Sequence, residues 1–476
     1  MDGGGARGIG SIELLSDLEK RVRLPYSVIK HFDVCYATSC GSGILLRLCD
    51  GWNIRTCIEY FTESAYQAFK PRRLMKWIQR LPVLSKVVLA VMVMFTDSKY
   101  PSNNLDSLLK REYGLRRSIM DYSKANEMGI RFGVTLTTVR GSRTAIASNY
   151  NAVGEMRKSL DYEMLTPRCG MRRIPLWEVI RGAMAAPVYF TPKHIASIGT
   201  FQDGGLHANN PVRIAEEEVA ALYPDKAEPS TVVSVGTGSS QLGDEKKSCI
   251  ERLMQAFWTH MSSKSTWEKL PSHQKIDKTT EHCRLDFDFK DSAPQLDDVD
   301  RMEEVSQVAR EAAASNTAMD RLASHLRAQL FYFELDHNCT PQFANGSFSC
   351  VGFILCRLEA GTTEFMTFMD QLHEASATFR LAGQSLPIIH DCVTKGVLHP
   401  RFCRTVYFRV SGRQAAFDIY MEEVPGKPFR ISGAPFTLEW LIGQQKLDAV
   451  FGTADHRKRL LEDSFTPAGR KRRRLR

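Results

Sequence analysis

The sequence lacks the long apolar segments and cysteine patterns that mark membrane, secreted and zinc-binding proteins. Its longest apolar run, residues 87–95, has nine residues, whereas a membrane-spanning helix needs about 20. The first ten residues, MDGGGARGIG, are charged and rich in glycine, unlike the apolar core of a signal peptide. The 12 cysteines among 476 residues are too dilute for a disulfide scaffold and form no CxxC pair. We therefore expect an intracellular protein with reduced thiols, cytoplasmic first of all, without a transmembrane segment.

The sequence also lacks a broad excess of positive charge. Its 63 Lys and Arg residues against 54 Asp and Glu give a net charge of +9, and +6 of that charge lies in the last 22 residues. The remainder is nearly neutral, which argues against nucleic acid as a partner of the folded body. The basic tail is typical of a nuclear-localisation segment or of a disordered solubilising tail, and both readings stay open.

Hydrophobic residues at 43% and charged residues at 25% are typical of a globular chain, whose length predicts two or three domains. Residues 1–328 place β-branched apolar runs between helix-like stretches, which predicts an α/β domain with parallel buried strands. Residues 329–452 read as a smaller α+β domain of unknown role, with a helix over 364–379 among several strands. Residues 453–476 read as a basic disordered tail.

The first motif is the glycine-rich stretch DGGGARG at residues 2–8. Consecutive glycines let several backbone N–H groups face one point, which suits an oxyanion or a phosphate. Gly3, Gly5 and Gly8 also fit the GxGxxG pattern of dinucleotide sites. That alternative needs an acidic residue at the end of a second strand about 20 positions on. The nearest candidate, Glu19, lies within a helix-like stretch, so nucleotide binding is the weaker reading.

The second motif is ATSCG at residues 37–41, between a β-type run and an apolar helix. A strand-to-helix turn of small residues is the setting of a nucleophile elbow, which would expose the Ser39 hydroxyl. The N–H of Cys40 and the dipole of the following helix would then favour negative charge on a substrate. The plainer alternative is that Ser39 only caps this helix.

The third motif is Asp203-Gly204-Gly205, which by itself is most often a turn. Its functional reading is a carboxylate that a glycine loop holds near a hydroxyl, where it acts as a general base. The only histidine close to these motifs is His207, and nothing in the sequence places it between Ser39 and Asp203. A Ser-His-Asp triad therefore has little support, and a two-residue arrangement remains.

Taken together, the three motifs resemble those of the patatin-like phospholipase family. Ser39 follows the glycines by 31 to 36 residues, and Asp203 follows Ser39 by 164. The phrases LWEVIRGAMAAPVYFTP, FQDGGLHANNPV and VVSVGTG are similar to the family as well. The resemblance covers about residues 1–330, and the later LEWLIGQQKLDAVFGT is similar to the C-terminal part of fungal patatin-like proteins.

This resemblance implies a three-layer α/β/α sandwich with a mostly parallel central sheet, followed by the smaller α+β domain. It implies a lipid acyl hydrolase in which Ser39 is the nucleophile and Asp203 the general base, with no metal or other cofactor. The implied oxyanion hole consists of the amides of Gly3, Gly4, Gly5 and Cys40. The implied supporting positions are Arg7, which holds the loop rather than a lipid phosphate, Gly8, Ala37, Gly41, Gly204 and Gly205, with Asn209 and Asn210 structural.

The sequence departs from the family pattern in two ways, which suggests an alternative to the hydrolase function. Ala37 stands where the family's elbow has glycine, with Ser42 at another usual glycine, and no apolar strand precedes Asp2. A sheet without that strand would support the glycine loop poorly. We therefore expect a shortened piece of a longer protein. The alternative function is a catalytically impaired patatin-like module that serves as an interaction or regulatory domain.

Residues 72–81, RRLMKWIQRL, combine an apolar helical face with four basic side chains. Such a segment could meet a membrane or lipid-droplet surface peripherally. A helix that covers the core with a solvated basic face would look the same. Protein partners are not indicated.

Overall fold

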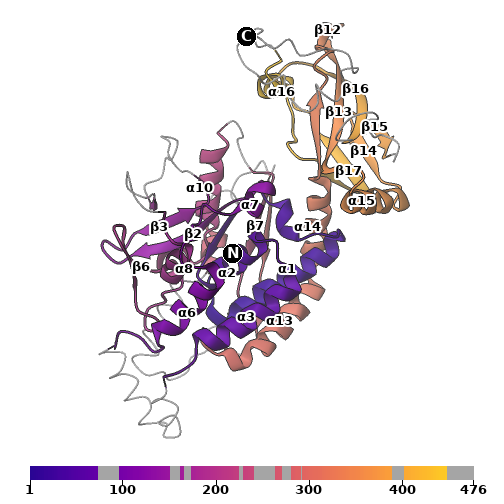
Figure 1. Ribbon diagram of the computed structural model, residues 1–476. Helices are drawn as coiled ribbons and strands as arrows, with labels where there is room; N and C mark the ends of the chain where they lie inside the picture. The colour runs from indigo at the N-terminus through magenta and orange to yellow at the C-terminus, as the bar shows by residue number, and fades with distance from the viewer. Residues whose placement is uncertain are drawn as a thin grey trace. The chain divides into compact units, whose positions relative to one another are not determined.

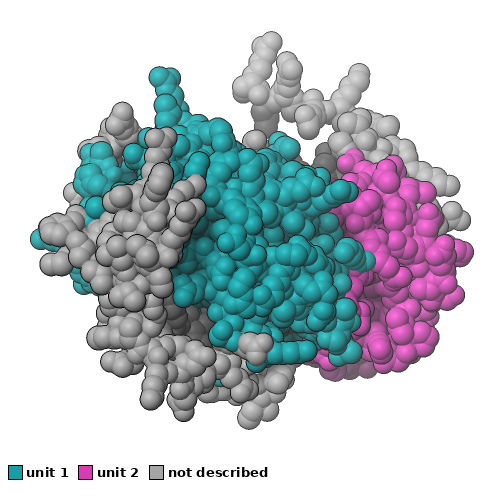
Figure 2. All heavy atoms as spheres, turned by 90° about the horizontal axis from the view of Figure 1, so that it is seen from below, with its two compact units in different colours: residues 1–20, 27–319 teal, residues 21–26, 320–476 magenta. Residues whose placement is uncertain are grey.

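A computed structural model describes residues 1–72, 96–150, 161–165, 173–224, 229–240, 263–270, 280–290, 292–388 and 401–447. The chain divides into two compact units, coloured separately in Figure 2. Unit 1 consists of residues 1–20 and 27–319, and unit 2 of residues 21–26 and 320–476. The predicted domain limit at residue 328 is the last residue of α14 (Thr317–Ala328), within which the units divide. Residues 73–81, 87–95 and the basic tail lie outside the described residues.

Unit 1 is built on a six-stranded sheet in the order β4-β3-β2-β6-β5, with β1 also beside β2. A second pair joins β7 to β9, and a third joins β8 to β10. The strands are β1 (Val34–Thr38), β2 (Arg131–Thr138), β3 (Thr144–Ser148), β4 (Tyr162–Met164), β5 (Lys193–Ile195), β6 (Gly199–Asp203), β7 (Thr231–Val235), β8 (Ser239–Ser240), β9 (Glu281–Leu285) and β10 (Asp288–Phe289).

Helices cover both faces of the six-stranded sheet (Figure 1). They are α1 (Gly8–Val22), α2 (Cys40–Cys49), α3 (Ile54–Ala68), α6 (Ser102–Tyr113), α7 (Ser123–Glu127), α8 (Leu176–Ala183), α9 (Gly205–Ala208), α10 (Val212–Leu222), α12 (Ser263–Glu268) and α13 (Met302–Ser315). On one face, α8 packs so closely that a Cβ on Gly182 would lie 3.1 Å from Leu136. On the other face, Tyr36 packs with Ile214 of α10.

The α/β class predicted from the sequence is confirmed, and the strand directions are mixed. β1 runs parallel to β2, β4 to β3 and β7 to β9, whereas β3 and β6 run antiparallel to β2 and β5 to β6. The reason for the β2–β3 direction is local: only a short turn with Gly141 at φ 85° separates the two strands. A connection of that length can join only antiparallel neighbours.

The glycine loop starts inside the sheet, between β1 and β7. The N–H of Thr38 donates to the carbonyl of Met1 (3.1 Å), and the N–H of Asp2 donates to the carbonyl of Val235 (3.0 Å). Met1 and Asp2 are therefore bonded to a different strand on each side. The expectation that a preceding strand is absent stays a prediction.

Unit 2 contains two four-stranded antiparallel sheets, β11-β13-β12 with β16 beside β13, and β15-β14-β17-β18. Their core is aromatic, since the ring of Phe331 lies 4.9 Å from Phe379 and 5.4 Å from Phe402, centroid to centroid. The elements are β11 (Phe331–Leu335), β12 (Gln342–Ala344), β13 (Ser347–Glu359), α15 (Thr363–Glu374), β14 (Thr378–Leu381), β15 (Gln384–Pro387), β16 (Arg401–Val410), β17 (Ile419–Val424), β18 (Lys427–Arg430) and α16 (Leu438–Gln445).

Candidate functional site

Ser39 occupies the turn between β1 and α2, where the backbone is strained. Its φ of 51° and ψ of −125° lie in a region that residues other than glycine rarely adopt. Such strain persists only where the surrounding structure enforces it, and it is most common at functional sites. Although Ser39 precedes the helix, its side chain makes no capping hydrogen bond to α2. The hydroxyl is thus directed elsewhere.

The Ser39 hydroxyl donates to Asp203 Oδ2 at 2.6 Å. Asp203 is the last residue of β6 and only 3% exposed. Its other oxygen, Oδ1, accepts from the N–H of Gly205 at 2.8 Å. Burial raises the pKa of Asp203 to about 6, partly opposed by the hydrogen bonds from Ser39 and Gly205. The turn and the carboxylate–hydroxyl pair that the sequence offered as alternatives therefore occur together.

Gly204 allows this approach because a side chain there would have no room. A Cβ at this position would lie 2.3 Å from Thr135 Oγ1 and 2.4 Å from the carbonyl oxygen of Thr135 on β2. His207, in contrast, is not part of the pair. Its Nε2 lies 2.8 Å from Ser142 Oγ at an exposed position.

The glycine loop passes beside Ser39. A Cβ on Gly3 would lie 3.0 Å from the Cβ of Ser39, and Gly5 adopts a φ of 57° that favours glycine. The N–H of Gly3 donates to the carbonyl of Asn209 at 3.3 Å, so this amide already has an acceptor. The N–H groups of Gly4 and Gly5 face the thiol of Cys40. The four residues expected around an oxyanion thus lie close together. Their amides differ, because that of Gly3 is bonded to a carbonyl and those of Gly4 and Gly5 face a thiol.

The small residues of the glycine loop and of the ATSCG turn are tightly packed. A Cβ on Gly41 would lie 2.7 Å from the carbonyl oxygen of Asp2, and one on Gly8 would lie 2.9 Å from Cys40 Sγ. Ala37, where the resemblance expects glycine, is fully buried. Its carbonyl accepts from the Ser42 hydroxyl at 3.2 Å, so the fold accommodates both Ala37 and Ser42.

Cys40 and Arg7 flank the loop. Burial raises the pKa of the Cys40 thiol to about 12, so this neighbour of Ser39 is protonated at neutral pH. Arg7 Nη1 donates to the carbonyl of Gly238 at 3.5 Å, and burial lowers the pKa of the Arg7 guanidinium. This contact agrees with a role in holding the loop.

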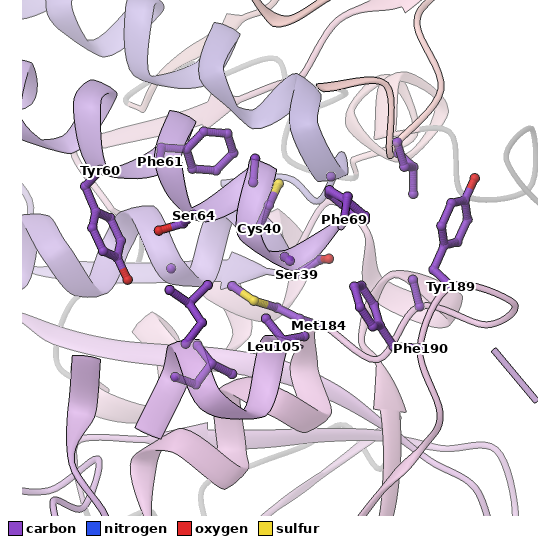
Figure 3. A pocket seen from close by; sticks show the side chains of 18 of the residues that line it. Ser39, Cys40, Tyr60, Phe61, Ser64, Phe69, Leu105, Met184, Tyr189 and Phe190 are labelled. Atoms are coloured by element: carbon purple, nitrogen blue, oxygen red, sulfur yellow. The ribbon is translucent and has the colours of Figure 1, made fainter. Parts of the chain in front are cut away.

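Ser39 lies in the wall of a largely apolar pocket with about 840 Å³ of empty space, its opening included. In Figure 3, Tyr60 lies at one end, Tyr189 and Phe190 lie at the other, and Ser39 lies between them. The lining residues come from the glycine loop, α2 and the turn before it, α3, α6, and the segments after α3, α8 and β10. They are Gly5, Ser39, Cys40, Gly43, Tyr60, Phe61, Ser64, Ala65, Ala68, Phe69, Leu105, Leu108, Leu109, Tyr113, Met184, Ala186, Tyr189, Phe190 and Leu296.

Two residues of the pocket wall, Tyr60 and Tyr113, pack against a cation that the sequence did not single out. The guanidinium of Arg47 lies 4.5 Å from the ring centroid of Tyr60 and 4.7 Å from that of Tyr113. It also donates to the Tyr60 hydroxyl (3.0 Å) and to Glu112 (2.9 Å). The charge of Arg47 is thus paired with that of Glu112.

The geometry also bears on a metal site and on a dinucleotide site. Within the described ranges, no group of three His, Cys, Asp or Glu side chains could hold a metal ion. A dinucleotide site would need an acidic residue at the end of a second strand. Glu19, the candidate for that position, lies instead on α1 and accepts from the N–H of Val28 at 2.9 Å. No helix in the described part of the chain combines the length and the hydropathy needed to cross a membrane.

The N-terminal part of the chain is similar to known phospholipases. Residues 1–216 match the family model described as patatin-like phospholipase. The chain is 26% identical to phospholipase A I of Arabidopsis thaliana, to calcium-independent phospholipase A2-gamma of Oryctolagus cuniculus and to the cGAMP-activated phospholipase of Vibrio cholerae. The alignments cover 50%, 50% and 52% of this chain and 20%, 27% and 64% of those proteins, less than two thirds of each.

A solved structure of VipD from Legionella pneumophila is similar over 66% of each chain, at 12% identity and a TM-score of 0.32, which is too low to bear on the fold. The similarity to the patatin-like phospholipase family therefore rests on the family model and on the α/β architecture of unit 1. Residues 1–216 thus match the patatin-like phospholipase model, and they contain the six-stranded sheet of unit 1.

Proposed function

We propose that unit 1 is a lipid acyl hydrolase, a phospholipase of the A type or a related carboxylic ester hydrolase, that uses Ser39 and Asp203. The observation that carries the proposal is the 2.6 Å hydrogen bond from Ser39 Oγ to Asp203 Oδ2 in the wall of an apolar pocket. The family match and the names of the three relatives support the same class of reaction.

In the proposed reaction, Ser39 Oγ attacks the carbonyl carbon of the ester while its proton passes to Asp203 Oδ2. The lipid alcohol then leaves with that proton, and the acyl group remains on Ser39. Water attacks the acyl-enzyme in the second half, with the same carboxylate as base, and releases the fatty acid. A pKa of about 6 suits Asp203 to this task, since it is ionised at pH 7 and still basic enough to accept a proton.

The oxyanion of the tetrahedral intermediate would be stabilised by backbone N–H groups. We assign this role to the backbone amides of Gly4, Gly5 and Cys40, and the first two of these face the Cys40 thiol next to Ser39. Gly3 joins them only if its N–H exchanges the carbonyl of Asn209 for the substrate, since the two are bonded at 3.3 Å. The N-terminus of α2 adds its dipole in the same place.

The substrate class follows from the pocket walls, which fit an acyl chain better than a polar group. Such a substrate would be reached at a membrane or lipid-droplet surface. The proposed steps involve no metal or organic cofactor. An intracellular location stays a prediction.

Labelling with a fluorophosphonate tests the proposal directly, because this reagent reacts with activated serines. Wild type should label, and Ser39→Ala should lose all labelling. Asp203→Asn should label at least about 100-fold more slowly, in line with the loss of a catalytic base. Ser64→Ala is the matched control, because Ser64 lines the same pocket, and it should label like wild type. A folded wild type that resists the reagent and hydrolyses no ester would instead favour the non-enzymatic module.

A further inference from the structure

Arg284, on β9, lies outside the matched residues 1–216 and holds two carboxylates at once. Its side chain is 11% exposed. Nη2 donates to Asp2 Oδ2 at 2.6 Å and to Asp286 Oδ2 at 2.7 Å, and Nη1 donates to Ser234 Oγ at 2.5 Å. One guanidinium thus joins the start of the chain to β7 and to the segment after β9.

Asp2 connects Arg284 to the glycine loop. It directly precedes Gly3, and its side chain is fully buried. Its carbonyl oxygen packs against the nucleophile turn, since a Cβ on Gly41 would lie 2.7 Å from it. Any movement of Asp2 therefore moves the loop relative to Ser39.

Asp286 provides a second connection to the same loop through residues 236–238. Its Oδ1 accepts from the N–H of Gly238 at 3.0 Å, and a Cβ on Gly236 would lie 2.3 Å from this carboxyl group. Between these glycines, the Thr237 hydroxyl donates to the carbonyl of Gly3 at 3.1 Å. The Thr237 side chain also fills the space beside Gly4.

The charges of this cluster balance only with Arg284 present. The charged groups that face Asp2 are Arg284, Asp286 and the amino group of Met1. Burial raises the pKa of Asp2, and Arg284 opposes that rise. Without the guanidinium, the fully buried carboxylate of Asp2 and the 18%-exposed carboxylate of Asp286 would lie close together with no side-chain cation between them. One of them would then have to take up a proton or move.

We propose that Arg284 is a positioning residue, which holds the amides of Gly4 and Gly5 in place through Asp2 and Asp286. This inference rests on the proposed function for its catalytic consequence but not for the contacts themselves. A preorganised donor is effective only if it does not have to reorganise during the reaction. Loss of Arg284 should therefore slow the chemical step and leave ester binding in the pocket unchanged.

Hydrogen–deuterium exchange of the peptide covering residues 1–8 tests the positioning without any need for activity. In Arg284→Gln, exchange in this peptide should rise about tenfold or more, whereas exchange in α2 stays at the wild-type rate. Arg117→Gln is the matched control, because Arg117 pairs with Asp50 at 2.5 Å elsewhere in unit 1. Unchanged exchange in folded Arg284→Gln, or an equal rise in the control, would overturn the proposal.

Arg284→Lys is the second variant for the exchange measurement and serves if Arg284→Gln does not fold. A single ammonium group cannot match the geometry of the guanidinium toward Asp2, Asp286 and Ser234, so we expect exchange in residues 1–8 to rise by a smaller factor than in the glutamine variant. Exchange equal to wild type in Arg284→Lys would show that bridging is not required and would also overturn the proposal.

Kinetics on a short-chain ester provides the second readout. In Arg284→Gln, kcat should fall at least tenfold with KM within about twofold of wild type. Adding Asp2→Asn should restore part of kcat, because it removes one of the two unpaired charges. No rescue together with unchanged exchange contradicts the inference. If wild type hydrolyses no ester but the exchange result holds, the proposed function fails and the positioning of the loop stands.

Discussion

The N–H of Gly3 donates to the carbonyl of Asn209 at 3.3 Å, which bonds the glycine loop directly to the segment that follows Asp203. Two motifs about 200 residues apart in the sequence are therefore fixed to each other beside Ser39. The bond also occupies an amide that the resemblance assigns to the oxyanion. In the proposed enzyme, this contact occupies the amide of Gly3, so the amides of Gly4, Gly5 and Cys40 remain to bind the oxyanion.

The pKa of Asp203 predicts how activity depends on pH. A general base must be deprotonated, and burial raises the pKa of this carboxyl group to about 6. We therefore expect kcat/KM to rise with pH, to reach half of its maximum near pH 6 and to level off above pH 7. Measurement with a soluble ester between pH 4.5 and 8 checks this. A half-maximum below pH 5 would contradict the assignment of Asp203 as the base.

The same shift predicts that Asp203→Asn stabilises the fold at neutral pH. A carboxyl group whose pKa rises on folding stabilises the native state below its unfolded pKa, and that contribution is lost as pH rises through about 6. Each pKa unit is worth about 1.4 kcal/mol, so a charged Asp203 costs on the order of 3 kcal/mol at pH 7. Thermal unfolding should show Asp203→Asn above wild type at pH 7.5, with the gap closing at pH 4. An equal gap at both pH values would contradict this account.

Gly204→Ala should disable the site through a steric clash rather than through charge. The added Cβ would lie 2.3 Å from Thr135 Oγ1 and 2.4 Å from backbone oxygen, and β2 cannot yield there without breaking its pairing. We expect a loss of about 2 kcal/mol in the free energy of unfolding and at least a tenfold loss of fluorophosphonate reactivity, because Asp203 is displaced. Gly443→Ala is the control, since nothing lies within 4 Å of its Cβ position, and it should leave both measurements near wild type.

The sequence identified the parts of the site that depend on local turn chemistry. The ATSCG turn and Asp203-Gly204-Gly205 each follow a short strand, and the structure has β1 and β6 ending at these motifs. The ends of other elements were predicted less accurately. The helix expected over residues 364–379 ends at Glu374, and Ser376 with a φ of 52° lies in the turn into β14. Helix periodicity does not reveal such a left-handed residue.

Arg284 and Arg47 could not be found from the sequence, because their roles depend on contacts between distant segments. Arg284 reaches Asp2 only because β9 pairs with β7, and Arg47 meets Tyr60 and Tyr113 only because α2, α3 and α6 come together around it. Alternation within a strand indicates which residues face inward but not what they meet there. The antiparallel β2–β3 pair departs from the expected parallel pattern for a different reason, because the short turn at Gly141 can join only antiparallel neighbours.

Ala65→Leu should shorten the acyl chain that the pocket accepts. Ala65 and Ala68 lie three residues apart on α3 and face the pocket opposite Leu105 and Leu109 of α6. Three added carbon atoms would fill the space between these helices while leaving Ser39 untouched. We expect hydrolysis of a 16-carbon p-nitrophenyl ester to fall at least tenfold and that of a 4-carbon ester to change less than twofold. Gln67→Leu, on the same helix but outside the pocket, is the control; parallel loss on both esters in Ala65→Leu would contradict acyl binding along α3.

Arg327 and Glu423 form a buried pair whose loss should destabilise unit 2. Arg327 Nε and Nη2 donate to the two oxygens of Glu423, each at 2.8 Å, and both side chains are at most 8% exposed. Removing one partner of such a pair typically costs about 3–5 kcal/mol, because the other charge stays buried. We expect Arg327→Met to lower the unfolding temperature accordingly in calorimetry of the full chain, and Arg327→Met with Glu423→Met to recover at least half of that loss.

The control for this pair is Arg23, which also contacts Glu423 but is 61% exposed at a distance of 3.2 Å. An exposed ion pair contributes at most about 1 kcal/mol, so Arg23→Gln should barely shift the transition. If Arg23→Gln and Arg327→Met destabilise unit 2 equally, charge rather than burial controls the effect. A double methionine variant no more stable than Arg327→Met would mean instead that the other acceptors of Arg327, the carbonyl of Val22 and the side chain of Gln371, account for the loss.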